Sequence, residues 1–221
     1  LDYHKTLEEY LDAKSVLFSM LSPDGHAILN HDDPSSTQIA KKTRANLLFY
    51  GIRRKAQVFA RNMSLQSDHT RFVLVTPQGE CDILFHLPGE YNVYNALAAA
   101  SCALGLGIPL VSIAKGIQSL QNVPGRLERI EEGQPFQVFV DYAHTSQAME
   151  SLLSSLYRTK RKRLLVVFGC GGDRDEGKRS PMGRSAAKYA DFTWITNDNP
   201  RTESPEKIAK QVEEGFLTTD D

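Results

Sequence analysis

The stretch Asp198-Asn199-Pro200-Arg201 carries side chains that could bind a small charged molecule. An apolar run at residues 192–196 precedes it, and a helix is expected from Ser204. This pattern predicts a strand that delivers an acid, an amide and an arginine into one loop, where open α/β sheets bind ligands. Arginine forks onto carboxylates and aspartate accepts hydrogen bonds from ammonium groups, so the loop could hold a zwitterionic amino acid. A plain turn is the alternative, because Asn-Pro often starts turns.

A glycine-rich segment at residues 169–179 is the second candidate. Its residues 172–178 match the spacing G-x-x-x-x-G-K of a phosphate-binding loop. We reject that interpretation because Arg179 stands where such a loop needs Ser or Thr to hold Mg²⁺, and because the acids of the segment would repel a phosphate. Arg174, between acids, suits an amino-acid ligand better. The alternative is a flexible, charged surface loop.

Lys14 lies inside an apolar stripe at helical spacing, seven residues after Leu7 and three before Leu17. A lysine on such a stripe usually buries its stem and keeps its amine in water. Burial of the amine would instead disfavour the ammonium. A neutral amine can add carbon dioxide and form a carbamate, which binds Mg²⁺. The residues alone leave both interpretations open.

Five further side chains could carry chemistry. Asn92 and Asn95 share one face at a helix start, where an amide could cap the helix or bind an adenine edge. Asp141 ends a predicted strand and His144 follows it. A strand-end acid reaches ribose hydroxyls in α/β nucleotide sites, although it more often caps a helix. Arg126 directly follows a Pro-Gly break.

The apolar pattern predicts the elements that must position these side chains. Strands alternate with helices after the break at Asn122-Val123-Pro124-Gly125, which predicts a parallel sheet with right-handed crossovers. We therefore expect an α/β protein with two domains, residues 1–123 and 124–221. Expected helices cover residues 6–20, 92–104, 110–120, 147–157 and 181–189, and expected strands cover 27–29, 47–50, 57–60, 72–75, 81–85, 137–140, 164–168 and 192–196.

The composition narrows the class of protein. The chain is 41% hydrophobic and 24% charged with a net charge of -1, which is a globular balance without a nucleic-acid footprint. No apolar run reaches the roughly 20 residues of a membrane span. Cys81, Cys102 and Cys170 lack zinc spacing, so we expect buried, reduced thiols in a cytosolic protein. The start at Leu1 rather than Met predicts a fragment or a processed chain.

Seven motifs resemble, in order, those of one family, the Mur ligases, and within it the UDP-N-acetylmuramoyl-tripeptide synthetases. They span nearly the whole chain, so the resemblance is specific. The motifs are Leu-Asp-Tyr-His at 1–4, Tyr-Leu-Asp-Ala-Lys at 10–14, Asn-Val-Tyr-Asn-Ala at 92–96, Val-Pro-Gly-Arg at 123–126, Asp-Tyr-Ala-His-Thr at 141–145, Gly-Cys-Gly-Gly-Asp-Arg-Asp at 169–175 and Asp-Asn-Pro-Arg at 198–201.

The resemblance implies an ATP-dependent amide ligase of peptidoglycan synthesis that uses ATP and Mg²⁺. Residues 1–123 would be the latter part of the ATP-binding central domain, a mixed sheet with helices. Residues 124–221 would be a Rossmann-like C-terminal amino-acid-binding domain that is incomplete at its end. The implied substrates are UDP-N-acetylmuramoyl-L-alanyl-D-glutamate and meso-diaminopimelate. We expect a cytoplasmic monomer that has neither nucleic-acid nor membrane partners.

The resemblance also implies roles for individual residues. Lys14 resembles the family's carbamylated lysine, which helps to position Mg²⁺. The implied nucleotide contacts are Asn92, Asn95 at the adenine, Arg126 and His144 near the phosphates, and Asp141 at the ribose. The implied site for the added amino acid comprises Arg174, Asp198, Asn199 and Arg201. Arg201 would grip the distal carboxylate of diaminopimelate, which lysine lacks.

Several departures from the family pattern limit this expectation. The family's UDP-binding domain, its phosphate loop and a metal-binding histidine are expected before Leu1, and part of the C-terminal domain is expected after Asp221. Ser146 replaces a usual proline. We therefore expect the chain alone to be inactive. The alternatives are the same ligase adding L-lysine, a ligase like folylpolyglutamate synthase, and a non-catalytic amino-acid-binding module.

Overall fold

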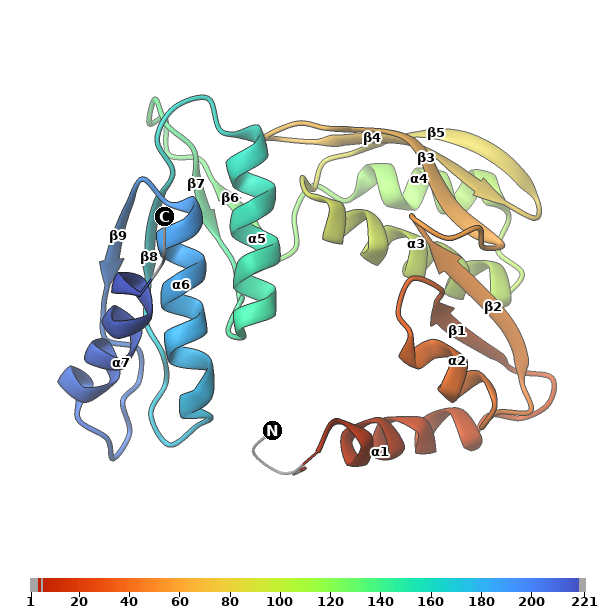
Figure 1. Cartoon of the computed structure of the whole chain (residues 1–221). Coiled ribbons are helices and arrows are strands. Elements are labelled where there is room, and N and C mark those ends of the chain that lie inside the picture. Colours follow the sequence, from red (N-terminus) through yellow and green to blue (C-terminus); the bar gives the residue numbers. More distant parts are fainter. Residues whose placement is uncertain (1–3, 5, 219–221) are drawn as a thin grey trace. The chain divides into compact units, whose positions relative to one another are not determined.

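The computed structural model describes residues 4 and 6–218, so residues 1–3 of the first motif lie outside the described part. The chain forms two compact units, of which the first ends at Val138 and the second begins at Phe139 (Figure 1). The domain boundary at residues 123 and 124 remains a prediction.

A five-stranded mixed sheet forms the centre of the first unit. Strands β1, β2 and β3 are parallel, and β3, β4 and β5 are antiparallel, in the order β1-β2-β3-β4-β5. Side chains of β4 alternate in burial, as expected for a strand with one face on a core. The strands are β1 (His26–Asn30), β2 (Asn46–Gly51), β3 (Val58–Leu65), β4 (Thr70–Thr76) and β5 (Gly79–Phe85).

Two helices cover this sheet. Helix α3 (Glu90–Gly105) packs against β1, β2 and β3, and α4 (Leu110–Ser119) packs against β5 (Figure 1). Small residues let α3 approach the strands closely, because Ala96 and Ala100 are buried beside Leu97. The sheet and these helices share one hydrophobic core. The predicted helices and the predicted hairpin of this region are confirmed.

Helix α1 (Leu7–Ser19) begins as predicted, because the Thr6 side chain accepts a hydrogen bond from the Glu9 N–H. Its apolar stripe, however, is covered only in part, since Leu11 and Phe18 are half-buried. Leu7 is 75% exposed and Leu17 is 66% exposed. The short helix α2 (Ser35–Ala40), which the pattern did not predict, packs against α1.

The second unit places helices on a parallel pair of strands. Strand β8 (Leu165–Phe168) pairs in parallel with β9 (Phe192–Ile195), which confirms the predicted parallel arrangement of these strands. Helix α6 packs against both α5 and α7. Their core includes Met149, Leu153, Met182 and Val212. The helices are α5 (Ser146–Thr159), the 3₁₀ helix η1 (Glu176–Lys178), α6 (Arg179–Tyr189) and α7 (Pro205–Leu217).

Three expectations need correction. Strand β7 (Val138–Val140) pairs with an unpredicted strand, β6 (Glu128–Ile130), in a sheet separate from that of β8 and β9. The expectation that all three thiols are buried is also wrong, because Cys170 is buried but Cys102 is exposed. Strand β3 extends to Leu65, five residues beyond its predicted end, because β4 pairs with it along this length.

The described residues include no helix that combines the length and the apolar character needed to cross a bilayer.

Candidate functional site

Two loops meet at the carboxyl ends of β8 and β9. The first, residues 169–175, follows β8, and the second, residues 196–203, follows β9. Because β8 and β9 are parallel neighbours, both loops leave the same edge of the sheet. The sequence placed Arg174 in the first loop and Asp198, Asn199 and Arg201 in the second, and the structure brings these two loops into contact.

Backbone and side-chain hydrogen bonds join the loops directly. The Gly172 N–H donates to the Asn199 carbonyl at 3.1 Å, and Nη1 of Arg201 donates to the Gly172 carbonyl at 2.5 Å. Thr202 Oγ1 donates to Asp173 Oδ1 at 2.7 Å. A Cβ atom on Gly172 would lie 1.8 Å from the Pro200 carbonyl oxygen, so only glycine permits this approach. The two loops therefore behave as one structural unit.

The backbone of both loops is in an unusual conformation. Asp173, Asn199 and Arg201 have positive φ angles of 52°, 43° and 52°. Residues other than glycine rarely adopt this region, and such conformations persist where the surrounding contacts fix them. They concentrate at ligand sites, which supports a binding role for this pair of loops.

Two charged side chains of these loops are available to a ligand. Arg174 and Asp198 are exposed, and within residues 4 and 6–218 neither makes an ion pair. Asn199 is exposed as well. Arg201 is exposed although one end of its guanidinium binds Gly172. The arrangement offers both signs of charge at one edge, as a zwitterion requires.

A buried ion pair lies under the loops. Arg179, which is 0% exposed, forks onto Glu203 with distances of 2.9 Å from Nη1 to Oε2 and 2.7 Å from Nη2 to Oε1. The hydrogen bond from Arg179, together with one from the Asp173 N–H, lowers the pKa of Glu203 to about 2. The sequence analysis did not identify this pair, because it treated Arg179 only as a departure from a phosphate-loop pattern.

The first unit has its own polar cluster, centred on Asp32 after β1. Its Oδ2 accepts hydrogen bonds from the backbone N–H groups of Ile52 at 2.7 Å and Arg53 at 3.0 Å, and from the Tyr94 hydroxyl at 2.8 Å. Oδ1 accepts from the Arg54 N–H at 2.7 Å. Asp32 therefore joins the ends of β1 and β2 to α3. Sequence reasoning missed it, because its partners lie at least 20 residues away along the chain.

The two predicted asparagines lie in α3, the helix that also carries Tyr94. Asn92 is fully buried and donates to the Pro88 carbonyl at 2.8 Å, so its side chain holds the start of α3. Asn95 is exposed, and its Nδ2 donates to Asn92 Oδ1 at 3.2 Å. Asn92 thus orients the Asn95 amide, whose oxygen remains available to a ligand.

The other three predicted nucleotide contacts lie in loops. Arg126 is exposed, and its N–H closes a turn onto the Val123 carbonyl at 2.9 Å. Asp141 Oδ1 accepts from the Ala143 N–H at 2.8 Å. His144 is exposed, and its Nδ1 lies 3.0 Å from the Tyr142 carbonyl. Their roles toward a nucleotide stay predictions.

Lys14 is exposed on α1, with its amine 5.4 Å from the centre of the Tyr10 ring. The burial that would neutralise this amine is therefore absent among the described residues, although Leu11 and Phe18 of the same stripe are half-buried. Nor do residues 4 and 6–218 contain a group of three or more His, Cys, Asp or Glu side chains that could hold a metal ion.

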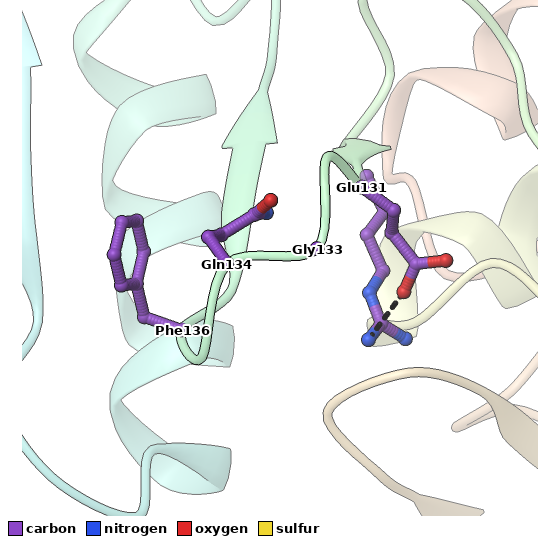
Figure 2. Close-up of a pocket in the computed structure, with 5 residues that line it drawn as sticks. Glu131, Gly133, Gln134 and Phe136 are labelled. Carbon is purple, nitrogen blue, oxygen red and sulfur yellow. Dashed lines mark ion pairs between the residues drawn. The ribbon is translucent and has the colours of Figure 1, made fainter.

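A cavity of about 280 Å³ lies at the loop between β6 and β7. Glu131, Gly133, Gln134 and Phe136 line it (Figure 2), together with Arg129, which forms an ion pair with Glu131 at 2.6 Å. None of the predicted site residues lines this cavity, so it does not contribute to the candidate site.

The fold and the paired strand-end loops define an α/β protein with a candidate ligand site beyond the carboxyl ends of its strands. Comparison with known families then makes the identification specific. Residues 1–103 match the Mur ligase middle domain, and residues 125–220 match the Mur ligase glutamate ligase domain. The chain belongs to the Mur ligase family.

Similar proteins are about twice as long as the chain. It is 45% identical to the UDP-N-acetylmuramoyl-L-alanyl-D-glutamate–2,6-diaminopimelate ligase of Bacillus licheniformis, over 97% of the chain and 45% of that protein. The Listeria monocytogenes ligase of the same name is 40% identical, over 100% of the chain and 46% of that protein. The chain thus spans somewhat less than half the length of these relatives.

Solved structures share the fold. A UDP-N-acetylmuramoyl-L-alanyl-D-glutamate–2,6-diaminopimelate ligase is 34% identical with a TM-score of 0.64, over 96% of the chain and 45% of that structure. MurF from Acinetobacter baumannii is 27% identical with a TM-score of 0.79, over 94% of the chain and 44% of that structure. A Mycobacterium tuberculosis folylpolyglutamate synthase, at 23% identity and a TM-score of 0.78 over 98% of the chain and 49% of that structure, is similar in fold alone.

Proposed function

We propose that the chain is part of an ATP-dependent amide ligase that adds meso-diaminopimelate to UDP-N-acetylmuramoyl-L-alanyl-D-glutamate. The names of the relatives support this proposal. The observation that carries it for this chain is the position of Arg201. Its guanidinium is held on Gly172, in a loop pair that also bears the exposed charges of Arg174 and Asp198.

The proposed reaction has two steps. A carboxylate oxygen of the nucleotide substrate attacks the γ-phosphorus of ATP, so that ADP leaves and an acyl phosphate forms. The amine of diaminopimelate then attacks the carbonyl carbon, phosphate leaves, and the amine nitrogen loses a proton. The chemistry requires positioning and charge neutralisation more than covalent catalysis by the protein.

The paired loops would bind the end of diaminopimelate that does not react. That end carries an ammonium and a carboxylate. Arg201 would donate to the carboxylate and Asp198 would accept from the ammonium, while Arg174 and Asn199 would supply further hydrogen bonds. L-lysine lacks the distal carboxylate, so it would leave Arg201 without its partner. This difference favours diaminopimelate over lysine.

For ATP, we propose that Asn95 contacts the adenine and that Asn92 orients Asn95. We further propose that Asp141 contacts the ribose, and that Arg126 and His144 contact phosphates. ATP-dependent ligases also need Mg²⁺ to neutralise phosphate charge. The described side chains do not form a metal site, and Lys14 is exposed, so a metal role of Lys14 depends on its conversion to a carbamate. A cytoplasmic, monomeric protein without membrane or nucleic-acid partners completes the proposal.

The test is a substrate comparison in the whole ligase that contains this chain. We expect meso-diaminopimelate to be used at least about a hundredfold more efficiently than L-lysine, measured as kcat/KM for each amino acid. Equal use of lysine would contradict the proposal. Failure to form an amide with either amino acid, together with formation of a folate–glutamate amide and release of phosphate, would favour the folylpolyglutamate type of ligase.

A substitution of Arg201 tests whether this side chain causes the preference for diaminopimelate over lysine. Arg201→Ala should lower kcat/KM for diaminopimelate ten- to hundredfold, because a charged hydrogen bond contributes about 1.5–3 kcal/mol. Its low rate with lysine should stay nearly unchanged. Arg184→Ala is the matched control, because Arg184 is another exposed arginine of the second unit, bound to Ser180 at 2.8 Å. If Arg201→Ala reduced the rates with diaminopimelate and with lysine equally, Arg201 would not bind the distal carboxylate.

A further inference from the structure

The ion pair between Arg179 and Glu203 lies where the two loops need support. Arg179 begins α6, and Glu203 ends the loop that carries Arg201. Arg179 is fully buried, and the Glu203 side chain is 14% exposed. Both Nη atoms of Arg179 are used on Glu203 in parallel hydrogen bonds. Such a fork fixes the direction as well as the distance between its partners.

Glu203 also reaches the glycine-rich loop. Its Oε1 accepts a hydrogen bond from the Asp173 N–H at 2.6 Å, and Arg179 Nη2 donates to the Gly171 carbonyl at 3.3 Å. One buried pair thus contacts both loops at the same time. The residues it contacts flank Gly172, whose carbonyl holds the Arg201 guanidinium.

Arg201 is consequently oriented before any ligand arrives. A Cβ atom on Gly171 would lie 3.0 Å from Arg201 Nη1, so the glycine pair gives the guanidinium room to lie along the backbone. With Nη1 on the Gly172 carbonyl, the other N–H groups of the fork stay available for a carboxylate. A shift of the loops against each other would turn the Arg201 guanidinium away from the carboxylate that it would bind.

We propose that Arg179 and Glu203 are positioning residues for the incoming amino acid, which fix the Arg201 guanidinium by clamping the two loops together. This inference rests on the proposed function, because it assumes that Arg201 binds the distal carboxylate. The pair does not touch the substrate itself. Changes to this pair should therefore weaken the binding of diaminopimelate and leave the binding of ATP and of UDP-N-acetylmuramoyl-L-alanyl-D-glutamate unaffected.

Steady-state kinetics of the whole ligase test the proposal. Glu203→Gln keeps the shape of the side chain but removes the negative charge, which weakens the paired hydrogen bonds with Arg179. Arg179→Lys keeps the positive charge but cannot form these two parallel hydrogen bonds. Each should raise the KM for diaminopimelate about tenfold or more. The KM values for ATP and for UDP-N-acetylmuramoyl-L-alanyl-D-glutamate should stay within about twofold of the parent protein.

Glu150→Gln is the matched control. Like Glu203, Glu150 is a carboxylate of the second unit that is paired with a basic side chain, since Lys188 Nζ lies 2.9 Å from its Oε1. This pair joins α5 to α6 and lies away from the loops. It should leave all three KM values within about twofold. Equal increases for every substrate in Glu203→Gln, or an unchanged KM for diaminopimelate, would overturn the proposal.

A third variant tests the proposal if Glu203→Gln and Arg179→Lys do not fold. Thr202→Val removes the hydrogen bond to Asp173 at the exposed side of the same junction without burying a charge. It should raise the KM for diaminopimelate about threefold, and an unchanged value would overturn the proposal. A parent ligase that does not use diaminopimelate at all would instead refute the proposed function, and the inference with it.

Discussion

Asp32 illustrates how one side chain can organise the ends of three elements. Burial alone would raise the pKa of its carboxyl group. The backbone N–H groups of residues 52–54 and the Tyr94 hydroxyl outweigh that effect and lower the pKa to about 2 from 3.8. Burial, together with the hydrogen bond to Asp32, raises the pKa of Tyr94. Ionised Asp32 therefore stabilises the folded first unit.

Asp32→Asn should destabilise the chain by about 1–2 kcal/mol at pH 7, after allowance for partial exposure of the carboxylate. The pKa is lower in the folded chain, so this stabilisation is present above 3.8 and is lost as the pH falls towards 2. The difference between parent and variant in urea unfolding, followed by circular dichroism, should therefore shrink from pH 7 to pH 3.

Asp33→Asn serves as the neighbouring control, because the Asp33 carboxylate accepts a local hydrogen bond from the Ser35 N–H at 2.8 Å. A difference between Asp32→Asn and the parent that stays constant across this pH range would contradict the linkage.

At the scale of elements, glycines set the distance between α6 and α7. A Cβ atom on Gly183 would lie 2.1 Å from the Val212 carbonyl oxygen, and one on Gly215 would lie 2.0 Å from the Ser180 carbonyl oxygen. The two helices therefore touch through their backbones. This close contact brings the start of α6, with Arg179, against the segment that carries Glu203 and α7.

Gly183→Ala should destabilise the second unit by about 1–3 kcal/mol, because the added methyl group forces the helices apart. Fluorescence of Trp194, in β9, reports urea unfolding of this unit. Gly116→Ala on α4 is the control, since nothing lies within 4 Å of its new methyl group and alanine favours a helix by about 0.5–1 kcal/mol. Equal stability of Gly183→Ala and the parent would show that the helices separate without cost.

At the scale of the whole molecule, two hydrophobic cores divide the chain. One includes Leu74 and Leu97, the other Met182 and Val212, and they have no residue in common. Proteins with separate cores can lose one part without the other. The stability of the loop pair should depend on the second core alone.

Met182→Ala should cost about 2–5 kcal/mol, because it leaves a cavity in a packed core. Hydrogen exchange should accelerate for amides of α6 and β8 and stay unchanged for those of β4 and α3. Leu97→Ala should give the reverse pattern. Faster exchange of β4 in Met182→Ala, to the same extent as α6, would mean that the chain unfolds as a single cooperative unit.

Much of the local structure follows from neighbouring residues. Apolar periodicity locates β8, β9, α3 and α6, because side-chain burial repeats with the geometry of each element. The short elements α2 and β6 escaped prediction, because a few residues carry too little periodicity. The apolar stripe of α1 correctly indicated a helix, but it could not say what covers that face.

The sequence by itself determined the family, the α/β class and the loop residues that bear charge, because these depend on residue types in order along the chain. Only the tertiary structure decided how these residues are held. The pairs Arg179 with Glu203 and Asp32 with Tyr94 join positions 24 and 62 residues apart, and no local pattern records which distant groups folding brings within 3 Å. Hydrogen bonding and close packing act through space, so the orientation of Arg201 follows from the fold.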